Sequence, residues 1–279
     1  MPFIAKANYC GAFDKKNIPM LDYHGRIGPQ YNPIAIAQYG LGNYNLYCRA
    51  GEKSRRSKFL SAADWLVENL EKTSHDTRVW YHHFDWEYRD TLKAPWYSAL
   101  SQGQGISLLV RAFKATKEER YLASAEDAFK AFNVNVRDGG VAYKDEKGHL
   151  WFEEYIVFPP THILNGFIWS TWGIYDYFLA TGNSIAKELF NQAVQTLKAN
   201  LHRYDIGFWS LYEQSGIRLK MIASPFYHHL HVIQLEILYK LTNEYLFHQY
   251  ALRWKNQRQN LIKRNLALGY KLVFKICYY

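Results

Sequence analysis

Ala50-Gly51-Glu52-Lys53 is a short connector between two helix-like segments, and comparable connectors recur along the chain. The others are Ala115-Thr116-Lys117-Glu118, Ala180-Thr181-Gly182-Asn183 and Leu241-Thr242-Asn243-Glu244. Their first residues are 65, 65 and 61 positions apart (50 to 115, 115 to 180 and 180 to 241). Such a near-constant period is the mark of a repeated supersecondary unit. The sequence therefore predicts four helical hairpins.

The two helices of each predicted hairpin differ in polarity. The first helices are apolar nearly all round, which is typical of buried helices; they cover residues 34–47, 97–113, 163–179 and 230–241. The second helices are amphipathic, with an apolar stripe such as Phe59, Ala62, Ala63, Leu66 and Leu70. An inner and an outer ring of helices follow, so we expect a mainly α fold, an incomplete (α/α) toroid. The alternative, an irregular bundle, is less consistent with the period.

Three aromatic, strand-like linkers separate the hairpins: residues 79–86, 140–155 and 207–213. The second reads as a β-hairpin around a polar turn at residues 145–148. Each linker is followed by a proline before the next inner helix (Pro95, Pro159 and Pro225), and Pro33 precedes the first. Proline suits the first turn of a helix, so we expect the inner helices to begin on one face. Their positive ends would favour an anionic ligand there.

The ends of the chain have weaker patterns. We assign residues 1–30 to an extended N-terminal arm, residues 31–265 to the (α/α) catalytic domain and residues 266–279 to a C-terminal tail. From Leu268 onward the tail alternates loosely like a strand, and it is basic and aromatic. We interpret this end as a surface helix followed by an edge strand.

Composition narrows the classes of function. The chain has 279 residues, of which 48% are hydrophobic, enough for one large buried core. Its net charge of +9 favours a polyanion: nucleic acid, an anionic membrane or an acidic polysaccharide. The sequence has no Gly-rich phosphate loop, no Cys/His spacing of a zinc finger and no RNA-binding aromatic motif, so nucleic acid is the weaker candidate for the polyanion. The aromatic share of 17% suits a carbohydrate site, because sugar faces stack on rings.

The sequence carries no signal for a metal, a cofactor or export. Cys10, Cys48 and Cys277 have neither disulfide-framework nor zinc spacing. We expect no cofactor, no membrane span and no signal peptide, because no long apolar run is present. A cytoplasmic location is favoured if the chain is bacterial and complete.

The chemistry-bearing residues centre on Glu153-Glu154-Tyr155, two adjacent carboxylates beside a tyrosine. Tyr212 and Tyr227 occupy an equivalent position later in the chain. Adjacent carboxylates on a strand more often mark a solvated edge, and lone tyrosines more often belong to a core. Our hypothesis is that these groups converge on a sugar uronate. Glu153 would point away from Glu154 in an extended segment and is then structural.

Several segments together resemble the C-terminal domain of heparan sulfate and heparosan D-glucuronyl C5-epimerases. The resemblance runs from about Tyr31 to Trp254 and rests on four segments, which are 31–41, 95–104 with 110–112, 153–155 with 164–176, and 227–235. It implies an (α/α) domain that inverts C5 of D-glucuronate to L-iduronate within a polysaccharide. It also implies that the catalytic residues are Glu154, Tyr155, Tyr212 and Tyr227. By analogy alone, it allows a homodimer.

The sequence departs at two places from the pattern of the animal members of this family. Ser215 stands where they have an arginine three residues after the tyrosine equivalent to Tyr212. Ser224-Pro225-Phe226 replaces their Arg-Trp-Asp before the last tyrosine. Arg218 is a candidate for the missing cation.

Removing the weakly acidic C5 proton builds charge on the uronate carboxylate, which the site must stabilise. Inversion then requires a base on one face of the ring and an acid on the other. We assign the base to Glu154 and the acid to Tyr227, or the reverse in the other direction, with Tyr155 and Tyr212 as hydrogen-bonding partners. A cationic site would lower the pKa of a tyrosine and make it a better base.

The predicted substrate contacts each have a structural alternative. Trp96, Gln102 and Gln104 are either a sugar platform or packing and helix–helix hydrogen bonds; Tyr97 and Asn165 are further candidates. His228 and His231 lie one helical turn apart, but without a third ligand we predict substrate contact or a structural role and no metal. Arg111, on an apolar helix, needs a partner such as Glu154 or the substrate carboxylate.

Two rival functions remain open from the residues. A polysaccharide lyase begins with the same proton abstraction but expels the C4 oxygen. A non-catalytic protein that binds acidic polysaccharide would keep the aromatic residues and the positive face without needing Glu154.

Overall fold

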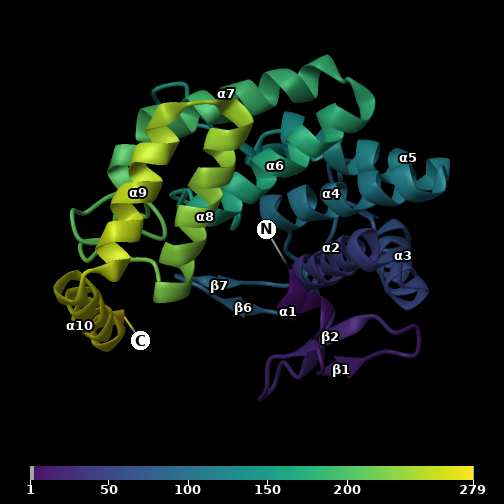
Figure 1. Cartoon of the computed structure of the whole chain (residues 1–279), viewed down its shortest axis with the longest axis horizontal. Coiled ribbons are helices and arrows are strands. Elements are labelled where there is room, and N and C mark those ends of the chain that lie inside the picture. Colours follow the sequence, from purple (N-terminus) through teal and green to yellow (C-terminus); the bar gives the residue numbers. More distant parts are fainter. Residues whose placement is uncertain (1–2, 279) are drawn as a thin grey trace. The chain divides into compact units, whose positions relative to one another are not determined.

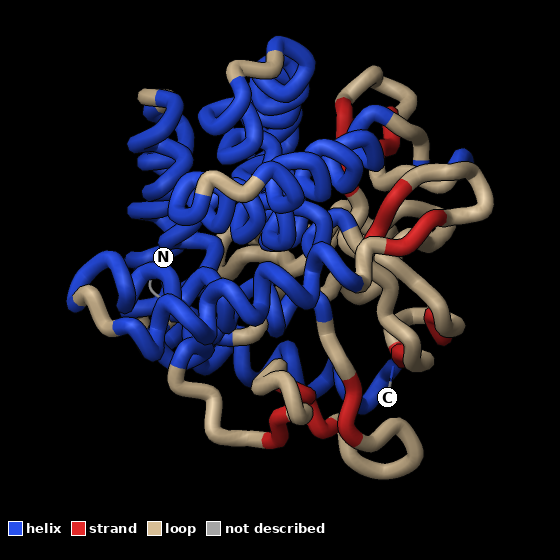
Figure 2. The backbone as a smooth tube through the Cα atoms, turned by 90° about the vertical axis from the view of Figure 1, so that its right-hand side faces the viewer, coloured by secondary structure: helices blue, strands red, loops and turns tan. Residues whose placement is uncertain are grey.

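The computed structural model describes residues 3–278, and its contacts divide the chain into two compact units. The first unit contains Met1–Tyr143 and Trp169–Phe190; the second contains Lys144–Ile168 and Asn191–Tyr279. Figure 1 labels the elements and Figure 2 distinguishes helix, strand and loop along the chain.

Helices make up most of the ordered structure. The α-helices are α1 (Ile4–Ala7), α2 (Pro33–Ala50), α3 (Lys53–Glu68), α4 (Ala99–Thr116), α5 (Glu119–Phe129), α6 (Leu164–Thr181), α7 (Ser184–Asn200), α8 (Pro225–Thr242), α9 (Tyr245–Gln259) and α10 (Leu261–Tyr278). Three 3-10 turns are η1 (Lys130–Asn133), η2 (Val136–Asp138) and η3 (Leu201–Tyr204).

The predicted hairpin repeat is confirmed. The helix pairs α2–α3, α4–α5, α6–α7 and α8–α9 are each joined by two residues that lie within the four quoted connectors. The residue that ends the first helix is left-handed in each case: Gly51, Lys117, Gly182 and Asn243 have φ of 70°, 66°, 70° and 56°. Glycine and asparagine accept this conformation most readily, and it satisfies the last carbonyls of the helix. The repeat therefore arises from a recurring C-terminal stop signal.

The first unit contains α1 to α5 and most of α6. Helices α4 and α6 pack closely at two glycines: a Cβ on Gly103 would lie 2.6 Å from Ser170 Cα, and one on Gly173 would lie 2.2 Å from the Gly103 carbonyl oxygen. Backbones approach this closely only where side chains are absent. This crossing explains the glycines at positions 103 and 173 of the two helices.

The second unit contains the beginning of α6, the end of α7 and all of α8, α9 and α10. Helices α8 and α9 pack against each other along their length. Large aromatic side chains fill the core of this unit, with Trp151, Trp209, Trp254 and Phe167 fully buried.

The strands are short and lie between loops, as Figure 2 shows; along the chain they occur in the linkers and before α2. They are β1 (Ala12–Phe13), β2 (Pro19–Asp22), β3 (Pro29–Gln30), β4 (Glu71–Lys72), β5 (Arg78–Val79), β6 (Trp86–Glu87), β7 (Thr91–Leu92), β8 (Ala142–Lys144) and β9 (Leu150–Phe152). Strands β1, β2 and β3 form an antiparallel sheet within the predicted arm, and the remaining strands pair consecutively. The predicted hairpin of the second linker is thus present as β8 and β9.

Three local expectations are wrong. The tail predicted as an edge strand is helix α10 up to Tyr278 (residue 279 lies outside the described residues), because its apolar residues also fit a helical period. The third linker forms isolated bridges such as Leu211 with Ile222 and no strand. Only Pro33 and Pro225 lie in the first turn of a helix; Pro95 and Pro159 lie four or more residues before theirs.

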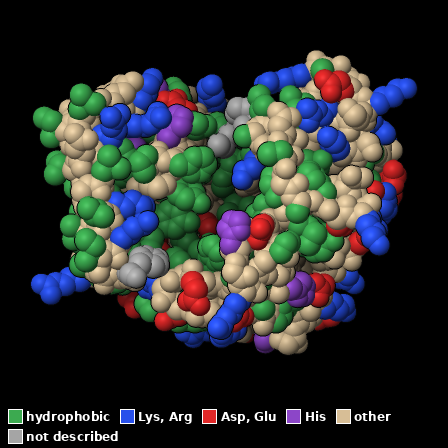
Figure 3. Space-filling model, turned by 90° about the horizontal axis from the view of Figure 1, so that it is seen from below, with side chains coloured by type: hydrophobic (Ala, Val, Ile, Leu, Met, Phe, Trp, Pro, Cys, Tyr) green, Lys and Arg blue, Asp and Glu red, His purple; other side chains and the backbone are tan. Residues whose placement is uncertain are grey.

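The charged side chains are dispersed. On the face drawn in Figure 3, lysine and arginine side chains are scattered and acidic side chains lie among them. Within the described residues, no helix is long and apolar enough to cross a membrane.

Candidate active site

The candidate site lies in the second unit and begins where β9 ends. Leu150, Trp151 and Phe152 are buried, and the next two residues, Glu153 and Glu154, are only 1% and 4% exposed. The adjacent carboxylates therefore do not form a solvated edge, which was the ordinary alternative. Two buried carboxylates in succession must each find partners or take up protons.

Glu153 is held by His162. Its Oε1 lies 2.5 Å from His162 Nδ1, and its Oε2 accepts the His162 backbone N–H at 3.1 Å. His162 has φ of 48°, its ring stacks on Trp151 at 4.2 Å, and its carbonyl accepts the Tyr204 hydroxyl at 2.5 Å. Glu153 thus fixes the strained turn that leads into α6, which is consistent with the predicted structural role.

Glu154 faces the first turn of α6. Burial raises the pKa of Glu154 to about 8, the charge on Glu153 adds to this rise, and hydrogen bonds from Tyr212 and Asn165 oppose it. The Asn165 Nδ2 lies 3.3 Å from Oε2. A Cβ on Gly166 would lie 2.1 Å from the same oxygen. Glycine at this position is therefore what lets the carboxylate reach the helix.

Tyr212 connects Glu154 to Tyr227. Its hydroxyl interacts with the Glu154 carboxylate and with the Tyr227 hydroxyl, because each of these groups shifts the pKa of the other. The rings of Tyr212 and Tyr227 lie 4.9 Å apart in an edge-on arrangement. Tyr155 is close enough for its charge to act on Tyr212. All four residues predicted as catalytic therefore lie in one cluster, although they are up to 73 positions apart (154 to 227).

Burial and the nearby Glu154 charge raise the pKa of both Tyr212 and Tyr227 above the ordinary value of 10. The direction is opposite to the expected lowering by a cationic site, because burial disfavours the phenolate and the neighbouring Glu154 is negatively charged when ionised. A tyrosine with a raised pKa holds its proton more firmly and is a weaker base.

Backbone hydrogen bonds hold this cluster together. The Leu164 N–H donates to the Tyr212 carbonyl at 3.1 Å, and the Gln214 N–H donates to the Thr161 carbonyl at 2.6 Å. The third linker therefore lies alongside the residues that enter α6. The Ser224 hydroxyl caps α8 by accepting the Tyr227 N–H at 3.3 Å.

Asn165 is the predicted contact that lies within this cluster. Its carbonyl accepts a hydrogen bond from the Gln234 side chain of α8 at 3.0 Å. Gln234, in the middle of α8, thereby ties this helix to the first turn of α6.

His228 and His231 lie in the core. His228 Nδ1 accepts the Ser210 N–H at 3.1 Å, and its Nε2 lies 2.9 Å from the Trp254 carbonyl oxygen. His231 Nδ1 lies 3.0 Å from the Ser210 hydroxyl. Burial lowers the pKa of His228 to about 4 and that of His231 to about 3, so both are neutral. Their placement favours the structural alternative, and no group of three or more metal-ligating side chains occurs within residues 3–278.

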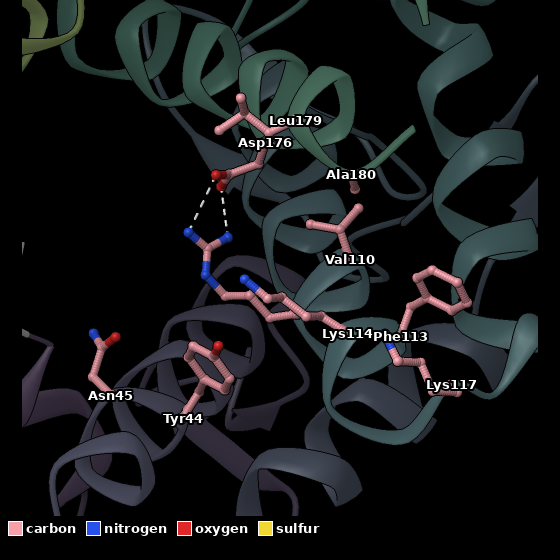
Figure 4. A pocket seen from close by; sticks show the side chains of 10 residues that line it. Tyr44, Asn45, Val110, Phe113, Lys114, Lys117, Asp176, Leu179 and Ala180 are labelled. Carbon is pink, nitrogen blue, oxygen red and sulfur yellow. Dashed lines mark hydrogen bonds and ion pairs between the residues drawn. The ribbon is translucent and has the colours of Figure 1, made fainter. Parts of the chain in front are cut away.

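Arg111 pairs with Asp176 within the first unit, and this corrects the expectation that Glu154 is its protein partner. Its Nη1 lies 2.6 Å from Asp176 Oδ2 and its Nη2 lies 3.2 Å from Oδ1. Ser107 also donates to Asp176 at 2.6 Å. Figure 4 shows this ion pair at the wall of a cavity of about 510 Å³, with Tyr44 and Lys114 nearby.

The remaining predicted substrate contacts of the first unit differ in burial and in hydrogen bonding. Gln102 is fully buried and bridges three backbone groups, accepting from Trp80 N–H and donating to the Arg78 and Ala128 carbonyls. Trp96 stacks on His82 at 3.8 Å, and Tyr97 is half-buried. Gln104 is 1% exposed, and its amide has no hydrogen-bond partner within residues 3–278. Gln102 thus fits the packing alternative.

Two residues of the second unit, Arg218 and Glu213, follow Tyr212 closely in sequence. Arg218 is exposed on the loop between Tyr212 and α8. Glu213, which the motifs did not single out, is 2% exposed, and burial raises its pKa to about 7 against a weaker opposing effect of Ser215. The only signal for Glu213 in the sequence is that this acidic residue stands directly beside Tyr212.

A family model described as the C-terminus of D-glucuronyl C5-epimerase matches residues 73–256. The chain belongs to this family. It is 34% identical to the D-glucuronyl C5-epimerase of Caenorhabditis elegans over 214 residues, which cover 70% of this chain and 34% of that protein. The chain thus corresponds to about a third of the nematode enzyme.

A second protein similar in sequence and one similar in fold extend the comparison. An uncharacterized protein of Methanocaldococcus jannaschii is 34% identical over 268 residues, 87% of this chain and 84% of that one. The cellobiose 2-epimerase from Spirochaeta thermophila is similar in structure, with a TM-score of 0.59 at 12% identity over 91% of this chain and 65% of that one. The predicted (α/α) toroid fold class is thereby confirmed. Family and fold together support a carbohydrate epimerase.

Proposed function

We propose that this member of the family inverts C5 of D-glucuronate to L-iduronate in a polysaccharide of the heparosan or heparan type. The observation that carries the proposal is the cluster in which the buried Glu154 carboxylate is linked through Tyr212 to Tyr227. Inversion at a carbon acid requires two proton-transfer groups, and this cluster contains a carboxyl and two phenols in contact.

Glu154 is the base in this proposal. With a pKa raised to about 8, its ionised form accepts a proton more strongly than an ordinary carboxylate does. The C5 proton of a uronate is weakly acidic, so a stronger base lowers the free-energy cost of its removal. The raised tyrosine pKa values favour the same assignment, because neither phenol readily becomes a phenolate.

Tyr227 is the acid in this proposal, and Tyr212 is the partner that connects it to Glu154. Once Glu154 holds the C5 proton, Tyr227 gives a proton to the opposite face of the carbanion. Tyr212, which interacts with both groups, then offers a path by which the proton on Glu154 replaces the one that Tyr227 has lost. Tyr155 also lies close to Tyr212 in the proposed site.

The developing enediolate needs positive potential. The first turns of α6 and α8, which begin at Leu164 and Pro225, adjoin the cluster and provide helix N-termini. Arg218, on the loop between the two tyrosines, is the candidate side-chain cation. The net charge of +9 suits an acidic polymer.

Incubation with heparosan in deuterated water tests the proposal. We expect deuterium at C5 together with iduronate, measured by NMR. A new C4–C5 double bond, detected by ultraviolet absorbance, would instead show a lyase. Binding without exchange or elimination would show a non-catalytic polysaccharide-binding protein. Glu154→Gln serves as the inactive control for exchange.

A further inference from the structure

Helix α10 (Leu261–Tyr278) exposes an unusual amount of apolar surface. Within residues 3–278, 17 large hydrophobic side chains are exposed, and 8 of them belong to this helix. These eight are Leu261, Ile262, Leu266, Leu268, Leu272, Val273, Ile276 and Tyr278. Single exposed hydrophobic side chains are ordinary, but a contiguous group marks an interaction surface.

The exposed side chains form one face. At about 100° per residue, all of them except Tyr278 fall on a continuous arc of about 160°. The opposite side of the helix contains its two buried residues, Ala267 and Phe274. That side is anchored to the second unit: the Tyr270 hydroxyl donates to the Lys220 carbonyl at 3.0 Å, and the Lys271 Nζ donates to the Ile222 carbonyl at 3.3 Å. The helix is therefore docked with its apolar face outward.

Basic residues border this face, and α10 contains no acidic residue. On the same projection, Arg264 and Lys275 lie along one edge of the arc and Lys263 lies along the other. The Lys263 Nζ also contacts the Gly207 carbonyl at 3.1 Å. Long basic side chains beside an apolar face keep their charges at the polar boundary while their stems cover apolar surface.

We propose that α10 is a membrane-surface helix that lies in the plane of an anionic lipid leaflet. The apolar face would enter the boundary between headgroups and acyl chains, and Arg264 and Lys275 would meet the anionic headgroups. Charge complementarity favours this occupant over a second copy of the chain. Two α10 helices facing each other would bring basic edges together with no carboxylate on either helix to offset them. This inference does not depend on the proposed epimerase reaction.

Vesicle partitioning of the full chain tests the proposal. The probes are vesicles of equal phosphatidylglycerol and phosphatidylcholine and vesicles of phosphatidylcholine alone, with the bound fraction measured by flotation. We expect binding to the anionic vesicles that weakens on addition of salt, and a partition coefficient about fivefold lower for each cation removed in Arg264→Gln and Lys275→Gln. The double variant Leu272→Glu/Ile276→Glu should not bind. Its matched control is Ile185→Glu on α7, whose side chain is 52% exposed, and it should bind like the unaltered chain.

A fluorescent label locates the contact. Cys10, Cys48 and Cys277 are all exposed, so a polarity-sensitive dye can be placed at one of them after the other two are changed to serine. On anionic vesicles the dye at Cys277, on α10, should shift to the blue, and the dye at Cys10 should not. The proposal is overturned if the Leu272→Glu/Ile276→Glu variant binds vesicles as the unaltered chain does. It is also overturned if the unaltered chain does not bind vesicles and sedimentation shows it to be a dimer that the Leu272→Glu/Ile276→Glu substitutions convert to a monomer.

Discussion

The Glu154 carboxylate lies against the backbone of Gly166, so closely that a Cβ on Gly166 would be 2.1 Å from Oε2 and 2.8 Å from the Glu154 Cβ. The carboxylate thus occupies the space where any other residue at position 166 would place its side chain. A methyl group there must displace Glu154 from the first turn of α6 and from the contact with Asn165.

Gly166→Ala should therefore reduce activity by about 10²-fold, the scale of a misplaced general base, while the helix itself remains intact. Gly269→Ala on α10 is the matched control, because a Cβ there meets nothing within 4 Å. In the control, we expect unchanged activity and a gain in stability of about 0.5–1 kcal/mol from helix propensity. Rates on heparosan and thermal unfolding measure both effects. Full activity in Gly166→Ala would show that the reaction does not need the Glu154 carboxylate to lie against position 166.

The pH dependence of the reaction reports the ionisation of Glu154. Because the base must be ionised and burial raises its pKa to about 8, the rate should rise about tenfold per pH unit between pH 6 and 7 and level off above pH 8. Glu154→Gln should lower the rate by 10²- to 10⁴-fold above pH 8, where Glu154 is ionised, and should abolish this rise with pH. A plateau that begins near pH 5 would contradict the raised pKa.

The same carboxyl links stability to pH. Its pKa is about 8 when folded and near its ordinary value of 4.5 when unfolded, so the folded chain binds more protons between these values. The free energy of unfolding must then fall as pH rises through this window. Glu154→Gln removes that penalty, so we expect it to be more stable than the unaltered chain at pH 8, by on the order of 4 kcal/mol. The difference should vanish near pH 4, and denaturant unfolding at the two pH values measures it.

Removing the acid separates exchange from inversion. In Tyr227→Phe, Glu154 can still remove the C5 proton and return one to the same face. We expect deuterium to enter glucuronate while iduronate formation falls by 10²-fold or more. Tyr245→Phe, at a phenol that is 59% exposed, is the control and should behave as the unaltered chain. Equal loss of exchange and inversion would show that Tyr227 serves the first proton transfer as well.

Asp176→Asn tests the role of Arg111. The change leaves the guanidinium of a half-buried arginine without its charged partner, so it should destabilise the chain by about 2 kcal/mol. If Arg111 is structural, the KM for heparosan should stay unchanged where the variant is folded. A raised KM with unchanged stability would return Arg111 to the predicted set of substrate contacts.

The helical hairpins could be predicted from the sequence because their ends and their buried faces depend on local residue patterns. The connectors end helices through residues that accept left-handed backbone, such as Gly51 and Asn243, and apolar periodicity distinguishes inner from outer helices. The same reasoning was wrong for the tail, because the alternation after Leu268 fits two periods and only its anchoring through Tyr270 and Phe274 makes it a helix.

The four proposed catalytic residues were recognisable from sequence segments, but the properties that support their roles come from tertiary structure. The raised pKa of Glu154 depends on burial against α6, and the link to Tyr227 depends on the pairing of residues 161–164 with 212–214. Such effects arise from desolvation and from contacts between distant segments, which no local pattern encodes. For the same reason only the structure assigned Asp176 to Arg111, placed His228 in the core and brought Gly166 against Glu154.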